Sequence, residues 1–337
     1  MTSGDRRHRL GHFTLESGAT LPDAWIAYKT HGTLNAEGSN AVLYPTQFAA
    51  QHGDVEWMIG PGRALDPRTH FIVVADQLGN GLSSSPSNTS PPYDRARFPV
   101  VTIRDDVTAQ HRLLTEGLGV RHLALVVGYS MGAQQAFQWA VSHPGFVERI
   151  APFCGTARTT AHNAVFLASL RTALTTDAAW LDGDYTSPPR RGLRALATIY
   201  AGWGFSQNFY NRGGHRQLGF SSIADCITGF WEARYAKRDA NNLLSMIRTW
   251  ELNDAGATPG MGGSLARALG SIRARCTIIA SRTDLYFRPA DLEAEANLIP
   301  GARFRVIPSD WGHMAGAGIN PEDSAVLTEE IQALLAT

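Results

Sequence analysis

The chain has 337 residues, of which 44% are hydrophobic and 18% are charged, and this is the composition of an ordinary globular protein. Its 30 Lys and Arg residues balance its 30 Asp and Glu residues, so no net charge favours nucleic acid, an anionic membrane or a polyacidic partner. Three scattered cysteines argue against a disulfide framework and against a CxxC metal site, and they fit a reducing compartment.

The first residues of the chain carry charges but no following apolar region, and no run of about 18 apolar residues occurs along the sequence. We therefore expect neither a secretory signal nor a membrane span. These features predict a cytoplasmic protein whose substrate is small or neutral.

Short apolar or β-branched runs bounded by polar turns recur along the chain and predict strands. They are residues 25–28, 41–44, 71–75, 123–127, 150–153, 277–280 and 304–307. Helical patterns follow at residues 107–118, 131–141 and 324–335. The alternation predicts βαβ units and hence a mostly parallel sheet covered by helices on both faces. A turn-rich stretch at residues 83–92 is predicted to be a surface loop.

The strand signal disappears over residues 156–269, which are rich in Ala, Leu, Trp and Gly. Helical patterns at residues 163–174 and 193–200 lie inside this stretch, and predicted strands lie on either side of it. We interpret residues 156–269 as a helical lid over the carboxyl edge of the sheet, where open α/β folds bind ligands. Residues 1–155 and 270–337 then form the core.

The sharpest local motif is Gly128-Tyr129-Ser130-Met131-Gly132, which directly follows a predicted strand and directly precedes a predicted helix. This is the context that a GxSxG nucleophile elbow requires. The glycines permit a strained turn that lifts the serine hydroxyl outward, and the helix points its positive end at the reacting centre. We predict Ser130 as the nucleophile, with a plain structural turn as the alternative.

A serine hydroxyl needs a base within hydrogen-bond reach and a carboxylate that orients the base. In the chain order of α/β hydrolases, the acid follows a late strand and the histidine follows the last one. Asp284 follows the predicted strand at 277–280, and His313 follows the strand at 304–307. We predict Asp284 as the orienting acid and His313 as the base. Asp310 is the competing carboxylate, but it lies in the same loop as His313.

An oxyanion hole combines the N–H group of the residue after the nucleophile with an N–H group from the loop after an early strand. The first is Met131. The second belongs to the loop after the strand at 41–44, and we assign it to Phe48, with an ordinary βα loop as the alternative.

Beyond these motifs, the chain is similar almost end to end to the homoserine O-acetyltransferase family of the α/β-hydrolase superfamily. The similarity is carried by residues 15–18, 26–35, 60–66, 98–107, 128–132 and 312–313. The resemblance implies an α/β-hydrolase fold and a serine that is acylated by a donor and deacylated by an acceptor. It also implies a helical lid over a tunnel and a homodimer assembled through the lids.

The chain departs from the family where the amino-acid acceptor would bind. The family's arginine after a lid tyrosine is replaced by Ala201 after Tyr200, and the acidic residue after the catalytic histidine is replaced by Met314. Taking a zwitterion into a pocket without charged partners is costly. We predict that Tyr200, Ala201, Trp203 and Met314 contact an apolar alcohol portion instead. A large aromatic residue in a helical segment, such as Trp203, is more often a core or dimer contact, and this is the alternative for that residue.

Without an amino-acid acceptor, water deacylates the serine. The sequence thus predicts a carboxylesterase for short-chain, acetyl esters of small apolar alcohols. No metal or cofactor is expected, because neither an HExxH motif nor a P-loop is present. Two alternatives stay open: an O-acyltransferase that uses acyl-CoA, and a catalytically silent scaffold that serves as a ligand receptor.

Overall fold

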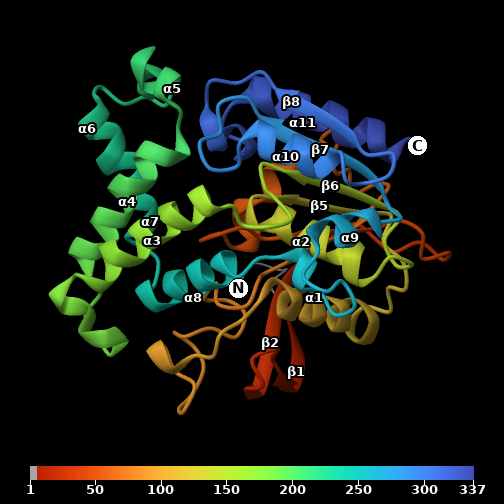
Figure 1. Cartoon of the computed structure of the whole chain (residues 1–337), viewed down its shortest axis with the longest axis horizontal. Helices are drawn as coiled ribbons and strands as arrows, with labels where there is room; N and C mark the ends of the chain where they lie inside the picture. Colours follow the sequence, from red (N-terminus) through yellow and green to blue (C-terminus); the bar gives the residue numbers. More distant parts are fainter. Residues whose placement is uncertain (1–5) are drawn as a thin grey trace.

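An eight-stranded sheet runs through the computed structural model, which describes residues 6–337 (Figure 1). The strands are β1 (Arg6–Thr14), β2 (Thr20–His31), β3 (Ala41–Pro45), β4 (Phe71–Ala75), β5 (Leu125–Tyr129), β6 (Arg149–Phe153), β7 (Arg275–Ser281) and β8 (Arg303–Ile307). Their order across the sheet is β1-β2-β4-β3-β5-β6-β7-β8. The pairs from β4 to β8 are parallel, and β1 and β2 form an antiparallel hairpin at one edge. The predicted α/β class is therefore confirmed.

Helices occupy most of the connections between strands, and one more follows the last strand. They are α1 (Ile103–Arg112), α2 (Met131–Ser142), α3 (Ala161–Thr175), α4 (Arg190–Gly204), α5 (Gln207–Asn211), α6 (Ile223–Cys226), α7 (Ala233–Tyr235), α8 (Ala240–Glu251), α9 (Leu265–Gly270), α10 (Pro289–Ala296) and α11 (Pro321–Leu335). α1 begins at a capping box, in which the Thr102 hydroxyl and the Asp105 carboxylate each accept the other's backbone N–H.

The central strands are buried on both faces, as their continuous apolar sequences predict. In β5, Val126 packs into a core cluster with Phe137 of α2, whereas its neighbours Leu125 and Val127 pack into a second cluster with Leu327 of α11. Successive residues of one strand thus pack alternately against the two layers of helices that cover the sheet.

Several strands differ from the sequence prediction, and β2, expected over residues 25–28, spans Thr20–His31. The sequence analysis did not predict β1, because most of its residues are charged or exposed and its buried residues are Leu10 and Phe13. β5 begins two residues later than predicted and extends to Tyr129, directly before Ser130, while Leu123 forms an isolated bridge with Val147.

The predicted surface loop at residues 83–92 is wrong in its first part. Ser83, Ser84 and Ser85 are at most 1% exposed. Their hydroxyl groups satisfy buried backbone: Ser83 Oγ donates to the Asp76 carbonyl and accepts from the Ala27 N–H. Short polar side chains can hydrogen-bond to buried backbone groups in place of water. In the sequence, such a run of serines has the same composition as an exposed turn.

The helices α3 to α8 lie between β6 and β7 in the chain and gather on one side of the sheet (Figure 1). The two ends of this insertion meet at an antiparallel bridge between Arg158 and Asp254, whose side chains also form an ion pair at 2.8 Å. A short neck therefore joins the insertion to the core.

Candidate active site

The turn between β5 and α2 holds Ser130 with a φ of 57°, a value that residues with side chains rarely adopt. A Cβ atom at Gly128 would lie 2.1 Å from the Gly132 carbonyl oxygen, and one at Gly132 would lie 2.7 Å from the Pro45 carbonyl oxygen. Because backbone atoms cannot move aside, both positions require glycine. The motif therefore forms the strained elbow that its sequence predicts.

The structure brings together the three side chains that the sequence singles out. His313 Nε2 lies 3.1 Å from Ser130 Oγ, and His313 Nδ1 lies 2.7 Å from Asp284 Oδ2. The other oxygen of Asp284 accepts the backbone N–H groups of Tyr286, at 3.1 Å, and Phe287, at 3.0 Å. These donors hold the carboxylate in place, so that one imidazole nitrogen is fixed and the other faces the hydroxyl group.

The competing carboxylate, Asp310, does not contact His313 through its side chain. Its oxygens lie 2.5 Å from Arg212 Nη1 and 2.8 Å from Arg282 Nη2. Asp310 therefore joins the histidine loop to the insertion and to the loop of Asp284.

The two N–H groups predicted for an oxyanion hole belong to segments in close contact. Phe48 lies three residues after β3, and Met131 is the first residue of α2. The close approach of Gly132 to Pro45 brings these segments together. Within residues 6–337, neither the Phe48 N–H nor the Met131 N–H donates to a protein acceptor.

Aromatic rings surround the imidazole of His313. The ring centroids of Tyr129, Tyr286 and Phe287 lie 4.7, 4.5 and 5.5 Å from that of His313. The Tyr129 hydroxyl also donates to the His313 carbonyl oxygen at 2.9 Å. Such rings favour a cation at their faces and fix the orientation of the imidazole. Sequence reasoning missed these residues, although Tyr129 stands inside the motif and Tyr286 follows Asp284 by two positions.

The four residues predicted to contact substrate are spread over the insertion and the histidine loop. Tyr200 is buried, stacks on Phe48 at a centroid distance of 6.0 Å and places its hydroxyl 3.3 Å from that of Tyr286. It therefore lies one ring away from His313. Its pKa is raised to about 12, first of all by burial.

Within the described part of the chain, the other three predicted substrate residues make no ring contact or side-chain hydrogen bond with the triad, although Met314 directly follows His313 in the chain. Ala201 is buried, and its carbonyl accepts the Tyr210 hydroxyl at 2.7 Å. Trp203 contacts His162 and Phe166 rather than His313. Met314 is buried in the main core cluster.

A cation does lie near the aromatic rings, although not at position 201. Arg234 of α7 is half-buried, and no carboxylate pairs with it among the described residues. Burial raises the pKa values of Tyr129, Tyr200 and Tyr235, and the positive charge of Arg234 opposes each rise. The sequence analysis did not single out Arg234, because residue 234 is distant from the motif.

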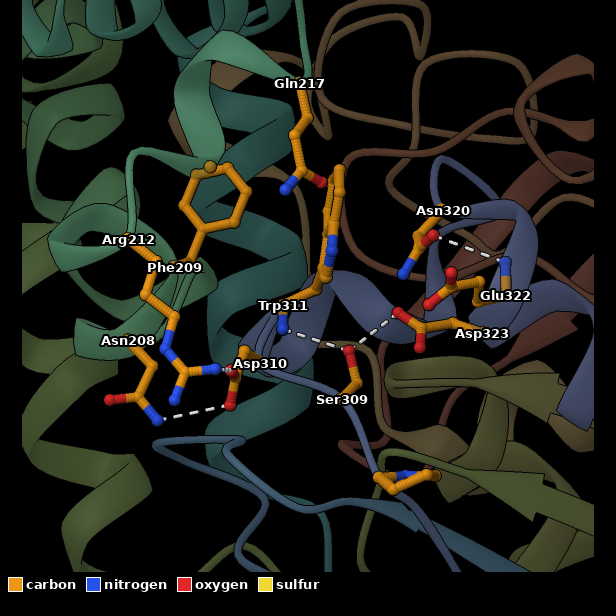
Figure 2. Close-up of a pocket in the computed structure, with 12 residues that line it drawn as sticks. Asn208, Phe209, Arg212, Gln217, Ser309, Asp310, Trp311, Asn320, Glu322 and Asp323 are labelled. Atoms are coloured by element: carbon orange, nitrogen blue, oxygen red, sulfur yellow. Dashed lines mark hydrogen bonds and ion pairs between the residues drawn. The ribbon is translucent and has the colours of Figure 1, made fainter.

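Ser130 and His313 are each 2% exposed, so the site is closed in this structure. A cavity of about 330 Å³ lies beside the histidine loop, lined by Asp310, Arg212 and Asn208 among others (Figure 2). Ser130 does not line this cavity. Figure 2 shows Arg212 and Asn208 reaching from the insertion toward Asp310. His313 does not line this cavity either.

Over residues 6–337, no group of three or more His, Cys, Asp and Glu side chains is arranged to hold a metal ion. In the same part of the chain, every helix is too short or too polar to cross a membrane.

The fold and this site define the class of protein. Residues 40–316 match the model of the α/β hydrolase fold family, and the chain belongs to that family. Within it, the chain belongs to a group that holds esterases together with homoserine O-acetyltransferases.

Three relatives illustrate this group. An ethyl acetate hydrolase of Pseudomonas veronii is 41% identical over 97% of this chain and 94% of its own length. A homoserine O-acetyltransferase of Trichormus variabilis is 31% identical over 90% of this chain and 87% of its own. The crystal structure of the acetyl esterase MekB superposes with a TM-score of 0.97 at 40% identity and covers 99% of this chain, with 97% of its own chain covered.

Proposed function

We propose that the protein is a carboxylesterase that hydrolyses acetyl esters of small apolar alcohols. The observation that carries the proposal is the continuous hydrogen-bonded line from Asp284 through His313 to Ser130 Oγ, at 2.7 and 3.1 Å. This line supplies a nucleophile, a base and an orienting acid in the order that acyl transfer requires.

In the first half-reaction, Ser130 Oγ attacks the ester carbonyl while His313 Nε2 takes the hydroxyl proton. The negative oxygen of the tetrahedral intermediate accepts the N–H groups of Met131 and Phe48. His313 then gives its proton to the leaving alcohol, and an acetyl-serine remains. In the second half-reaction, His313 takes a proton from water, water attacks the acetyl group, and acetate leaves as Ser130 regains its proton.

The acetyl preference is supported by the names of the relatives and by the walls of the site. Relatives named ethyl acetate hydrolase and acetyl esterase match almost the whole chain at about 40% identity. Tyr200, Tyr286 and Phe48 are all buried and leave little polar surface around the triad. A small apolar ester is desolvated at low cost in such surroundings.

Steady-state kinetics with two substrate systems test this function. We expect the purified protein to release acetate from ethyl acetate, and to release no CoA from acetyl-CoA in a homoserine-dependent manner. Release of CoA that depends on homoserine, without ester hydrolysis, would overturn the esterase proposal.

A second candidate function, O-acyl transfer to a hydroxylated acceptor, is favoured by Arg234. Arg234 directly precedes Tyr235, whose ring centroid lies 5.4 Å from that of Tyr200, and a guanidinium in this region suits an acceptor that carries a carboxylate. If this function holds, Arg234→Met abolishes CoA release and leaves ethyl acetate hydrolysis within about threefold of wild type.

We also infer a homodimer assembled through the insertion, and a cytoplasmic location. Val165, Leu181 and Ile223, all on the insertion, are 63, 61 and 46% exposed, which suits contact with a second copy. All three cysteines are free thiols, which suits a reducing compartment. Sedimentation velocity should give twice the monomer mass, and Val165→Glu should shift the protein toward monomer.

A further inference from the structure

Buried side-chain amides bind carbonyl groups of the loop at residues 46–50, whose Thr46 N–H donates to the Ala75 carbonyl oxygen of β4. Gln135 Nε2 donates to the Thr46 carbonyl oxygen at 2.9 Å, and Gln77 Nε2 donates to the Gln47 carbonyl oxygen at 2.9 Å. Both glutamine side chains belong to fully buried residues. Because a buried carbonyl oxygen needs a donor, these amides fix the side of the loop on which its carbonyl groups lie.

One of these amides also binds the nucleophile helix. Gln135 lies one turn after Met131 on α2, and its Nε2 atom is 3.2 Å from the Met131 carbonyl oxygen. A single NH₂ group therefore links the loop that carries Phe48 to the helical turn that carries Met131. These are the two segments whose free N–H groups would bind the oxyanion.

The orientation of the Gln135 amide is set by a relay of hydrogen bonds. The indole of Trp139 can only donate, and its Nε1 atom lies 2.7 Å from Gln110 Oε1. Gln110 Nε2 must then face Gln135, and it lies 2.5 Å from Gln135 Oε1. The Oε1 atom of Gln135 is thus occupied, and its NH₂ group is left to face Thr46 and Met131.

We propose that Gln135 is a positioning residue of the oxyanion hole, which holds the Phe48 and Met131 N–H groups at the spacing that a tetrahedral intermediate requires. Trp139 and Gln110 act through Gln135 by fixing the direction of its amide. This inference rests on the proposed function, because it assigns a role in the same acyl-transfer reaction.

The expected effect falls on the rate constant of the chemical step. Removing one oxyanion donor altogether costs about 10²–10³-fold in kcat, so a displaced donor should cost about 10–100-fold. KM for a neutral ester should change by less than about threefold, because the oxyanion forms only in the transition state.

Two substitutions remove the donated hydrogen bonds without changing side-chain size. Gln135→Glu replaces the NH₂ group by a carboxylate oxygen, which repels the Thr46 and Met131 carbonyls. Gln110→Glu leaves Gln135 in place but has no N–H for Gln135 Oε1, so the Gln135 amide turns its NH₂ group toward the new carboxylate. Gln138→Glu is the matched control, since Gln138 lies on the same helix, is 1% exposed and bonds to Ser142 and Thr258 instead.

The experiment measures kcat and KM for ethyl acetate together with the inhibition constant of a trifluoromethyl ketone, whose serine adduct carries an oxyanion. For Gln135→Glu and Gln110→Glu we expect kcat to fall about 10–100-fold and the inhibition constant to rise by a similar factor. For Gln138→Glu we expect both constants within about threefold of wild type. Where Gln135→Glu fails to fold, Gln110→Glu carries the same expectations.

The outcomes separate this inference from the proposed function. A wild-type protein that does not hydrolyse the ester overturns the function itself. A wild-type esterase whose kcat and inhibition constant are unchanged in the folded Gln135→Glu or Gln110→Glu variant overturns the role of Gln135 alone. The role of Gln135 is also overturned if kcat falls equally in all three variants and in proportion to a fall in their melting temperatures, because this result indicates a purely structural effect.

Discussion

Asp284 and Asp310 stand on neighbouring loops, yet their carboxylates serve different partners. Asp284 accepts hydrogen bonds from the imidazole of His313 and from two backbone N–H groups. Asp310 instead forms ion pairs with the guanidinium groups of Arg212 and Arg282. The geometry therefore assigns them separate tasks, orientation of the base and attachment of the insertion.

This difference predicts opposite outcomes for the same substitution. Asp284→Asn should lower kcat by about 10³–10⁴-fold with little change in KM, because an amide no longer holds the tautomer of His313 that accepts the serine proton. Asp310→Asn is the control and should keep kcat within about threefold, since its partners are surface arginines. Steady-state kinetics on both variants decide the matter, and a larger loss in Asp310→Asn would refute the assignment of the acid.

Sequence reasoning located Ser130, Asp284 and His313 because each lies in the turn or loop after a strand, and strand runs are visible in the sequence. It did not find Gln135 or Arg234. The proposed role of Gln135 depends on which distant backbone carbonyl its amide reaches, and a glutamine on a helix carries no such information.

At the level of secondary structure, the neck of the insertion depends on the buried carboxyl group of Glu295. Glu295 of α10 accepts the N–H groups of Ala157 at 2.7 Å and Arg158 at 3.2 Å, where the chain leaves the core. Burial raises the pKa of Glu295 from its ordinary value of 4.5 to about 8, although the two N–H groups oppose the rise.

This shift predicts a pH-dependent stability. Between about pH 4.5 and pH 8, the folded protein binds a proton at Glu295 that the unfolded chain has released, so stability falls as pH rises through this window. The loss reaches at most roughly 5 kcal/mol, at about 1.4 kcal/mol per pKa unit. The free energy of unfolding, measured with urea, should therefore differ less between pH 5 and pH 8 for Glu295→Gln than for wild type.

The control for this measurement is Glu293→Gln, on the exposed face of the same helix. This variant should show the same difference in free energy of unfolding between pH 5 and pH 8 as wild type. If Glu295→Gln retains that difference as well, another group is responsible for it.

Most strands and helices could be predicted because apolar periodicity survives in the sequence even where boundaries move, by two residues at the start of β5 and by five at the start of β2. The edge strand β1 and the buried serines at 83–85 could not. In both, the side chains that matter are polar, and their partners are backbone groups supplied by the rest of the fold.

At the scale of the whole molecule, the insertion presses directly on the histidine loop. Gly312 has a φ of 62°, and a Cβ atom there would lie 2.7 Å from the Ser206 nitrogen and 2.9 Å from the Gly204 carbonyl oxygen. His313 follows immediately, so the fit of the two parts of the molecule sets the position of the base.

Substituting this glycine should therefore affect stability and activity together. Gly312→Ala should lower the free energy of unfolding by about 2–4 kcal/mol, from left-handed strain plus overpacking, and should reduce kcat. Gly301→Ala is the control, because Gly301 has a φ of 70° but no atom within 4 Å of the added Cβ. It should cost about 1–2 kcal/mol and leave kcat unchanged. Equal effects of the two substitutions on kcat would contradict the role of this contact.

The central claim is that Ser130 is a nucleophile activated by His313, and covalent labelling tests it most directly. The protein is incubated with a fluorophosphonate, digested and mapped by mass spectrometry, with Ser130→Ala and His313→Ala treated in parallel. We expect one adduct, on Ser130, formed rapidly in wild type, absent in Ser130→Ala and formed at least about 100-fold more slowly in His313→Ala. A wild-type protein left unmodified at Ser130, or labelled equally fast without the imidazole, would contradict the account.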